Sequence, residues 1–330
     1  MKVVITGGAG FLGRRLAQKL LDQGSLACPD GQTRTIDELV VFDAVEPAPF
    51  PATDPRVRVL IGSIADGGLM NRLIEPDVDT VFHFAAVVSG AAEADFDLGM
   101  RVNIDGTRAL FEACRALAKP PTVVFTSSVA VFGGALPPVL DDDTPLRPQT
   151  SYGMQKAVGE LLLNDYTRKG FMDGRALRLP TISVRPGKPN KAASSFASGI
   201  FREPLNGEEA VCPVGPEARM WLLSPRRVID AFLRAHALPA EAWGSDRSLN
   251  LPGISCTVGE MVEGLRRVAG EEVVKRIRWE HDPLIARIVA GWPGNFDTPR
   301  AKRLGFVGDS SIDEIIKAHI EDEVKPAAAA

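Results

Sequence analysis

Short apolar runs alternate with helical patterns along the first half of the chain. The runs at 2–6, 38–43 and 57–66, the last including its turn, are rich in valine and isoleucine, which is typical of parallel strands covered on both faces. Strands separated by amphipathic helices predict an α/β fold with a doubly wound parallel sheet. The other elements expected in this half are strands over 80–87 and 122–128 and helices over 14–23, 68–74, 100–118 and 155–168.

The pattern becomes less regular after residue 186. Helices are expected over 226–236 and 258–268 and a strand over 248–251, while the polar segments 24–37 and 188–198 are typical of loops. We therefore expect a smaller, partly interleaved C-terminal domain beside the sheet domain. The expected division is a sheet domain over 1–180 with return segments around 225–255, and a substrate-binding region over 181–224 and 256–330.

Composition and charge exclude several classes of protein. With 330 residues, 45% hydrophobic and 24% charged, the chain fits a globular protein of one large or two smaller domains. The net charge is −4 and no basic stripe is present, so nucleic acid is not an expected partner. No stretch approaches the roughly 18 apolar residues of a membrane span, and the chain begins directly with a strand, so neither a membrane partner nor a signal peptide is expected. The four cysteines lie far apart, which predicts reduced thiols in the cytoplasm and no metal site.

A glycine-rich turn follows the first expected strand. Gly7, Gly10 and Gly13 are spaced as G-x-x-G-x-x-G, and Phe11 and Leu12 stand at the start of the helix that follows. Glycines at this spacing let the chain turn tightly and bring backbone N–H groups close to a pyrophosphate, which the positive end of the helix also attracts. A strand, a glycine turn and a helix in this order predict dinucleotide binding.

Other candidate cofactor contacts follow later strands. Asp43 ends the second strand, where an acid binds the adenosine ribose hydroxyls and repels a 2′-phosphate, so NAD is favoured over NADP. The alternative is an acid that merely ends a strand. Ser63 and Ile64 follow the third strand, and the small residues Ala85 and Ala86 would let a flat ligand approach the fourth.

Tyr152 and Lys156 are four residues apart where a polar turn leads into a helix, so their side chains fall on one face. A free phenol titrates near pH ~10, and a close cation would lower that pKa by about 1–3 units. The pair would then supply a proton acceptor near neutral pH. An amphipathic helix with a surface lysine is the alternative. Ser127 and Ser128 end the fifth strand, at the same edge of the sheet where ligands of such folds bind.

This combination resembles the extended branch of the short-chain dehydrogenase/reductase family, whose fold is a Rossmann sheet. The resemblance covers about the first 190 residues. The segments that carry it are 6–13, 83–86, 103–107, 127–133 and 152–156.

By the pattern of that family, Ser128 is the catalytic serine beside the substrate and Tyr152 is the acid/base, also in contact with cofactor and substrate. Lys156 is implied to support Tyr152 and to hold the nicotinamide ribose. Asn103 is implied to hold the helix and the water of a proton relay. Ser63 is a departure, because the family usually has Asp there, and it would contact the adenine through its hydroxyl or not at all.

The chain from 166 to 214 is similar to a group of sugar-acid dehydrogenases within this family. The likeness implies NAD-dependent oxidation of the hydroxyl next to the carboxylate of a small sugar acid. The expected reaction is D-erythronate to 2-dehydro-D-erythronate. Members of the family often dimerise through a helix pair that includes the Tyr–Lys helix, so a homodimer is expected by resemblance.

Candidate substrate contacts lie later in the chain than the segments expected to bind the cofactor. Arg219 could clamp a carboxylate with its planar guanidinium, and Arg185 and Arg202 are its rivals. Thr181 and Ser194 are further candidates. Loop serines and surface salt bridges are the alternatives for these residues.

Two other classes of function remain open. A nucleotide-sugar epimerase or dehydratase would share every residue of the cofactor site, although dehydratases usually have Thr-Asp-Glu where this chain has Ser127-Ser128-Val129. A non-catalytic NAD-binding protein would have no need of Ser128, Tyr152 and Lys156 together. NADH formation with aldonates and with UDP-sugars would separate the three.

Overall fold

The computed structural model describes residues 1–47, 54–187 and 193–324. The chain divides into two compact units, each assembled from three segments. None of the helices in the described ranges combines the length and apolar character needed to cross a bilayer. The first unit comprises Met1–Val131, Thr150–Arg178 and Ile229–Leu249, and the second comprises Phe132–Gln149, Leu179–Val228 and the chain from Asn250 onward.

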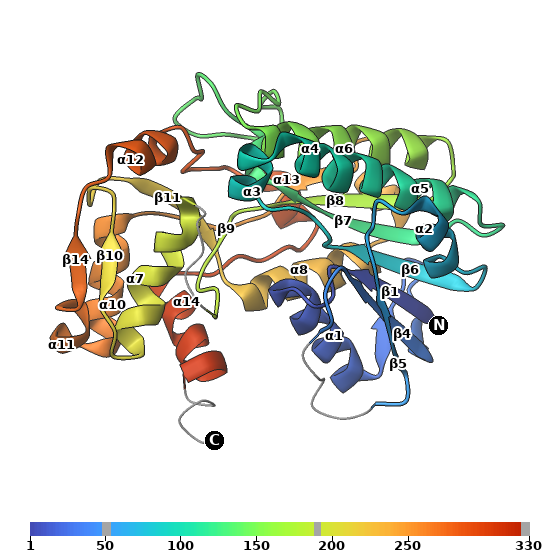
Figure 1. Cartoon of the computed structure of the whole chain (residues 1–330), viewed down its shortest axis with the longest axis horizontal. Helices are drawn as coiled ribbons and strands as arrows, with labels where there is room; N and C mark the ends of the chain where they lie inside the picture. Colours follow the sequence, from blue (N-terminus) through green and yellow to red (C-terminus); the bar gives the residue numbers. More distant parts are fainter. Residues whose placement is uncertain (48–53, 188–192, 325–330) are drawn as a thin grey trace. The chain divides into compact units, whose positions relative to one another are not determined.

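A seven-stranded sheet, most of it in the first unit, has the order β12, β8, β7, β6, β1, β4, β5 (Figure 1). The pairs β1–β4, β1–β6, β4–β5 and β6–β7 are parallel. The chain runs outward from β1 through β4 to β5 and then crosses to β6, so the strand order reverses beside β1. That reversal is the switch point where ligands bind in open α/β sheets, and the predicted doubly wound Rossmann sheet is confirmed. The strands are β1 Lys2–Thr6, β4 Glu38–Asp43, β5 Val57–Ile61, β6 Val78–His83, β7 Thr122–Ser128, β8 Asp173–Leu179 and β12 Ser248–Asn250.

Helices cover both faces of this sheet. Figure 1 shows α2, α5 and α6 along one face and α1 on the other. Under the first group lies a core that includes Phe111, Phe125 and Leu163, each no more than 1% exposed. Because both faces are covered, the central strands are apolar throughout rather than alternating. The helices are α1 Phe11–Gln23, α2 Gly67–Leu73, α3 Ser89–Ala94, α4 Phe96–Gly99, α5 Thr107–Arg115, α6 Ser151–Arg168, α8 Pro225–Ala237 and α9 Ala240–Trp243.

Three local predictions were wrong in detail. The expected loop 24–37 contains a two-stranded hairpin, β2 Ser25–Ala27 and β3 Thr33–Thr35, whose turn uses Gly31 at φ +78°. The expected strand 80–87 ends at His83, so the segment after it is irregular. The expected helix 100–118 begins as a π-helix over Met100–Gly106, labelled η1, before α5.

The second unit contains a three-stranded sheet of order β13, β11, β9 and a two-stranded sheet of β10 and β14. Its core includes Phe201, Leu222, Met261 and Ile315, all fully buried. The strands are β9 Thr181–Ile182, β10 Ala210–Cys212, β11 Arg219–Leu223, β13 Ile254–Thr257 and β14 Ile277–Trp279. The helices are α7 Phe196–Leu205, α10 Val258–Ala269, α11 Glu271–Val274, α12 Pro283–Ala290, α13 Pro299–Arg303 and α14 Ile312–His319; the short 3₁₀ and π segments are η2 Val129–Val131 in the first unit and η3 Ala193–Ser195 and η4 Ile320–Val324 in the second.

The segment Phe132–Gln149 belongs to the second unit, although the sequence placed it in the sheet domain. Its contacts explain the difference. Leu140 exchanges backbone hydrogen bonds with the chain around Phe296, and the rings of Phe132 and Phe296 are 5.7 Å apart. Neither contact could be inferred from local sequence, because more than 150 residues separate the partners. The functional division at residue 180 stays a prediction.

Candidate active site

Tyr152 and Lys156 lie in the first two turns of α6, a helix that begins earlier than expected. The side chain of Thr150 caps this helix by accepting a hydrogen bond from the Gly153 N–H at 3.1 Å. Tyr152 is partly exposed, whereas Lys156 is only 3% exposed. Lys156 Nζ lies 5.6 Å from the centre of the Tyr152 ring and 4.8 Å from the centre of the Phe125 ring. The face of Phe125 therefore stabilises a buried ammonium that sits beside the phenol.

The pKa of the phenol changes in the direction opposite to the expected one. Burial raises the pKa of Tyr152 to about 12, and its hydrogen bond with Ser128 acts against that rise. Burial also lowers the pKa of Lys156 to about 7, so its charge is partial near neutral pH. The pKa of Tyr152 is thus raised and not lowered as the sequence predicted, because desolvation of the phenolate outweighs its hydrogen bond with Ser128.

Ser128 stands at the C-terminal end of β7, beside the phenol. Its hydroxyl is hydrogen-bonded to Tyr152 and accepts a hydrogen bond from the Ala130 N–H at 3.1 Å. The 3₁₀ turn Val129–Val131 follows the strand directly and holds that N–H in place. The structure therefore brings Ser128, Tyr152 and Lys156 together within the first unit, as their order on a parallel sheet predicts.

A buried carboxylate lies one turn beyond Lys156 on the same helix. Glu160 is 3% exposed, and the charge on its carboxylate opposes the fall in the pKa of Lys156. It accepts hydrogen bonds from Ser127 Oγ at 2.5 Å and from the Arg178 guanidinium at 2.7 and 3.0 Å. This network ties β7 and β8 to α6 behind the Tyr–Lys pair.

Asn103 lies in the π-helix η1 and is 3% exposed. Its amide accepts a hydrogen bond from the Val87 N–H at 2.8 Å and donates to the Val87 carbonyl at 3.0 Å and to Gln155 Oε1 at 2.7 Å. These bonds join the segment after β6 to α6 at Gln155, three residues after Tyr152. Asn103 is therefore placed to position the helix, and its role toward a relay water stays a prediction.

The glycine turn between β1 and α1 leaves its backbone open to a ligand. Gly7 has φ +71°, and a Cβ there would lie 2.6 Å from the backbone N of Ala85. A Cβ on Gly13 would lie 2.3 Å from the carbonyl oxygen of Gly7. Gly10 is the N-cap of α1 and makes no side-chain capping bond, so the helix N-terminus presents its N–H groups outward. This turn fits the pyrophosphate of NAD.

Phe11 and Leu12 form the first turn of α1 and are partly buried. The guanidinium of Arg15 lies 5.1 Å from the centre of the Phe11 ring. Asp43, at the end of β4, accepts a hydrogen bond from the Ala9 N–H at 2.9 Å. The acid therefore touches the glycine turn itself, which supports a role in holding the cofactor.

The remaining cofactor candidates line the same edge of the sheet. Ala85 and Ala86 are partly exposed just beyond β6. Ser63 is exposed, whereas Ile64 is 4% exposed and in contact with Gly106, where an added Cβ would lie 2.6 Å from its side chain. Packing against the π-helix accounts for Ile64 without a ligand, so contacts of Ser63 and Ile64 with the adenine stay predictions.

The substrate candidates belong to the second unit. Thr181 is in β9, opposite Leu222 of β11, and is partly buried. Ser194 lies in the 3₁₀ turn before α7 and is partly buried. Arg219 is exposed, and its guanidinium donates to Ser255 Oγ at 3.2 Å. Residues 188–192 of the expected loop 188–198 lie outside the described residues. From 193 onward the segment is helical rather than a loop.

Sequence reasoning missed Glu160, Arg178 and Gln155. Glu160 follows Lys156 by one helical turn, and this spacing could have indicated a carboxylate on the same face. Arg178 meets Glu160 only through the pairing of distant elements, so no local signal marks it. Gln155 stands inside the segment 152–156 and is fully buried, which its polar side chain does not suggest.

Comparison with known proteins now defines the class. A glycine turn, an acid after the next long strand and a Ser–Tyr–Lys set are typical of NAD-dependent oxidoreductases. The model of the NAD dependent epimerase/dehydratase family matches residues 3–247, and the chain belongs to this family. The family resemblance seen in the sequence and the choice of NAD as cofactor are thereby confirmed.

Individual relatives cover nearly the whole chain. A D-erythronate dehydrogenase from Cupriavidus necator is 57% identical over 322 residues, which is 98% of each chain. One from Haemophilus influenzae is 48% identical over 97% of this chain and 99% of its own. A crystal structure described as a nucleoside-diphosphate-sugar epimerase from Agrobacterium tumefaciens is 46% identical with a TM-score of 0.93, and the match covers 98% of this chain and 95% of that chain.

Proposed function

We propose that this chain is an NAD-dependent dehydrogenase that oxidises the C2 hydroxyl of D-erythronate to give 2-dehydro-D-erythronate. The observation that carries the proposal is the identity of 57% and 48% with two D-erythronate dehydrogenases over nearly the full length. The partly exposed Tyr152, with the buried Lys156 and with Ser128 beside it, supplies the chemistry that such a reaction needs.

The oxidation removes two groups from the substrate: the proton of the C2 hydroxyl and the hydride on C2 itself. Bound NAD⁺ supplies the hydride acceptor for C2. Ser128 Oγ hydrogen-bonds the C2 hydroxyl, and Tyr152 takes its proton. The pKa of about 7 for Lys156 keeps a group beside Tyr152 that changes charge near neutral pH, while the pKa of about 12 for Tyr152 favours oxidation at higher pH. We therefore expect the oxidation rate to rise from neutral to mildly alkaline pH.

Other parts of the proposal concern the cofactor and the assembly. Asp43 is proposed to hold the adenosine ribose and to disfavour NADP.

A homodimer through α6 is proposed because Leu161 on that helix is 66% exposed, with Met154 and Val158 only partly buried. We also propose a cytoplasmic location. The molar mass by light scattering, with Leu161→Glu as the variant, tests the dimer.

A nucleotide-sugar epimerase is the second candidate. The described function of the Agrobacterium tumefaciens structure, 46% identical, favours it. An epimerase returns its hydride to the sugar and therefore forms no net NADH. The two candidates differ in that readout, although their cofactor sites would be the same.

The test is an NADH assay with a panel of substrates. Purified protein and NAD⁺ are mixed with four- to six-carbon aldonates and, separately, with UDP-sugars, and Tyr152→Phe is the control. We expect one NADH per D-erythronate consumed and almost none with Tyr152→Phe. Conversion of a UDP-sugar without NADH, together with no response to any acid, would replace the dehydrogenase by the epimerase.

A further inference from the structure

We propose that Glu160 is a positioning residue for the oxidation, whose buried negative charge keeps Lys156 in the ammonium form beside Tyr152. The inference rests on the proposed function, because it concerns how the acid/base pair of that reaction is kept active. Every residue that it uses belongs to the first unit.

Glu160 follows Lys156 by one turn of α6. Residues four apart are neighbours on a helix surface, and both of these side chains are only 3% exposed. The helix lies very close to β7 here, since a Cβ on Gly159 would lie 2.6 Å from Cζ of Phe125. The same ring lies under the ammonium, with 4.8 Å between its centre and Lys156 Nζ. The carboxylate and the ammonium are therefore held in one closely packed layer between α6 and β7.

The Glu160 carboxylate is fixed in place by two partners on neighbouring strands. Its Oε1 accepts a hydrogen bond from Ser127 Oγ at 2.5 Å, on β7. On β8, Arg178 Nε donates to both carboxylate oxygens at 3.0 and 3.1 Å, and Arg178 Nη2 donates to Oε2 at 2.7 Å. Ser127 is two residues beyond Phe125, so both side chains are on the face of β7 that packs against α6. Because these bonds fix the carboxylate, its field acts on Lys156 from a constant position.

The ion pair of Glu160 with Arg178 does not explain itself as a stabilising contact. Arg178 is 7% exposed, and the desolvation of two buried charges is about as large as their attraction. An apolar pair of similar size would often serve the fold equally well. The charge of Glu160 has a second effect, however, because it opposes the loss of a proton from Lys156.

Three elements bring charged or titratable groups to Lys156. Tyr152 and Glu160 lie on α6, and Arg178 of β8 binds Glu160. His83 ends β6 and is neutral, because burial and then the charge of Lys156 lower its pKa to about 3. Arg178 shares the charge of Glu160, so burial still lowers the pKa of Lys156 to about 7. Lys156 therefore gains and loses its proton near neutral pH.

The coupled protonation of Tyr152 and Lys156 shows why this charge matters. At low pH both side chains hold their protons. Loss of one proton gives two forms in equilibrium, one with a phenol and a neutral amine, the other with a phenolate and an ammonium. Only the second form accepts the proton of the substrate. A negative charge beside the amine favours that form, so Glu160 raises the share of molecules that can react.

Glu160→Gln should change the pH dependence of kcat in a way that damage to the fold would not. Lys156 then loses its proton more easily, so the midpoint of the rise in kcat should move down by about one pH unit. The share of the reactive form falls by the same factor, so kcat above the midpoint should fall about tenfold. At about pH 5, below both midpoints, kcat should equal that of wild type, because Tyr152 alone then sets the share of the reactive form.

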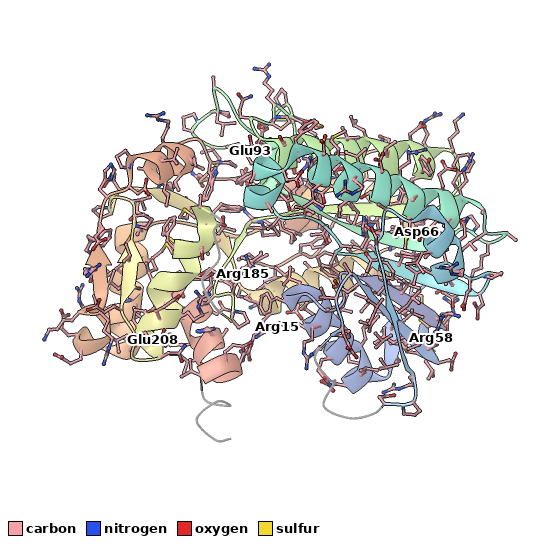
Figure 2. The ribbon with its side chains drawn as sticks, viewed as in Figure 1. Arg15, Arg58, Asp66, Glu93, Arg185 and Glu208 are labelled. Carbon is pink, nitrogen blue, oxygen red and sulfur yellow. The ribbon has the colours of Figure 1, made fainter. Side chains whose placement is uncertain are left out.

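Glu93→Gln is the matched control. Glu93, labelled in Figure 2, is an exposed carboxylate on α3 that accepts a hydrogen bond from the Ser151 N–H at 2.9 Å, at the first residue of α6. The field of an exposed charge is screened by water and salt, so this variant should keep the midpoint and stay within about threefold of wild type. An unmoved midpoint in Glu160→Gln, or an equal loss of kcat at every pH, would overturn the proposal.

A second variant guards against misfolding. Glu160→Gln leaves the guanidinium of Arg178 buried without its carboxylate, which is strongly destabilising. The double variant Glu160→Gln with Arg178→Gln removes both charges. Its midpoint should also lie below that of wild type, although by less, because a positive charge is lost as well. A midpoint at or above the wild-type value in the folded double variant would contradict the proposal.

A titration without substrate separates this test from that of the proposed function. The nuclear magnetic resonance signal of Lys156 in protein with carbon-13 lysine, assigned by its loss in Lys156→Met, reports the proton directly. We expect a midpoint at about pH 7 in wild type and about one pH unit lower in Glu160→Gln. If wild type oxidises D-erythronate and this midpoint does not move, the function stands and Glu160 is not a positioning residue. If wild type oxidises no aldonate, the function fails and the role of Glu160 in it is withdrawn.

Discussion

The most unusual single residue is the buried Lys156. An ammonium that is 3% exposed is unfavourable in a protein interior, and its pKa is lowered to about 7 accordingly. The rings of Phe125 and Tyr152 and the charge of Glu160 work in its favour. A residue that destabilises the fold and stands beside the tyrosine proposed as the acid/base is expected to be there for the reaction.

Replacing Lys156 by Met should separate stability from activity. We expect kcat to fall by roughly 10²–10⁴, the usual contribution of acid–base assistance. Between pH 7 and the ordinary value of 10.5 the unfolded chain holds a proton that the folded chain does not, so burial of Lys156 lowers the free energy of unfolding at pH 7. The Tm of Lys156→Met should therefore equal or exceed that of wild type.

The matched control is Lys169→Met, at the exposed C-terminal end of the same helix. Thermal denaturation and NADH formation are measured for both variants. A drop in Tm for Lys156→Met larger than that for Lys169→Met would mean that Lys156 serves the fold and not the reaction.

Residue types at fixed spacing were readable from the sequence, but their environment was not. The motif segments identify Ser128, Tyr152 and Lys156, because chemistry requires those side chains in that order. The rise in the pKa of Tyr152 depends on burial, which no spacing encodes. Glu160 escaped notice because its partners, Ser127 and Arg178, come from two different strands.

At the scale of elements, the glycine turn and α1 act as one device. The turn is so tight that Gly13 approaches the backbone of Gly7, and α1 starts with a cap that has no side chain. A glycine cap gives up only a few tenths of a kcal/mol relative to a Ser, Thr, Asp or Asn cap, since it offers no side chain to the first N–H groups of the helix. The arrangement is explained by a ligand that supplies negative charge at that place.

Gly13→Ala should therefore weaken cofactor binding. The new Cβ would lie 2.3 Å from the Gly7 carbonyl oxygen and 2.8 Å from Gly8 Cα, so the backbone of the turn must move. We expect the Kd for NAD⁺ to rise at least tenfold, equivalent to about 1.4 kcal/mol. Titration calorimetry measures it directly, and Tm is recorded in parallel.

Gly67→Ala in α2 is the control, since a Cβ there has no atom within 4 Å. Alanine favours a helix over glycine by about 0.8–1.0 kcal/mol, so this variant should be as stable as wild type or more so. Unchanged NAD⁺ affinity in Gly13→Ala would show that the turn does not hold the cofactor.

Helices and strands with a regular spacing of apolar residues were predicted well, and irregular elements were not. β4, β7, α8 and α10 lie where the apolar pattern placed them, within a residue or so at each end. The hairpin of β2 and β3 was missed because its strands have only three residues each, too few for a period-two signal, and because β3 is polar throughout. The π-helix η1 was read as an ordinary helix because its hydrogen-bond shift leaves no trace in composition.

At the scale of the whole molecule, the chain passes repeatedly between two units, and local pattern could show only part of that. The return of the chain to the sheet was expected around 225–255, and contacts place such a return over Ile229–Leu249. His236 illustrates how it is fixed. Its ring nitrogens bond Thr80 Oγ1 at 2.9 Å and the Ala27 carbonyl at 2.8 Å, partners that lie over 150 residues away.

The buried histidines of the first unit should make its stability depend on acid. Burial lowers the pKa of His236 to about 4 and that of His83 to about 3, so both are neutral when folded. The unfolded chain binds their protons below about pH 6.5, and stability is therefore lost as the pH falls from there toward 4. His236 alone would contribute at most about 3 kcal/mol of this loss.

Urea denaturation between pH 4 and 8 should show a shallower decline in the free energy of unfolding for His236→Gln than for wild type. His281→Gln, at an exposed position, should match wild type. Equal slopes for wild type and His236→Gln would mean that the site takes up a proton without unfolding, and that the return segment is held by contacts other than this ring.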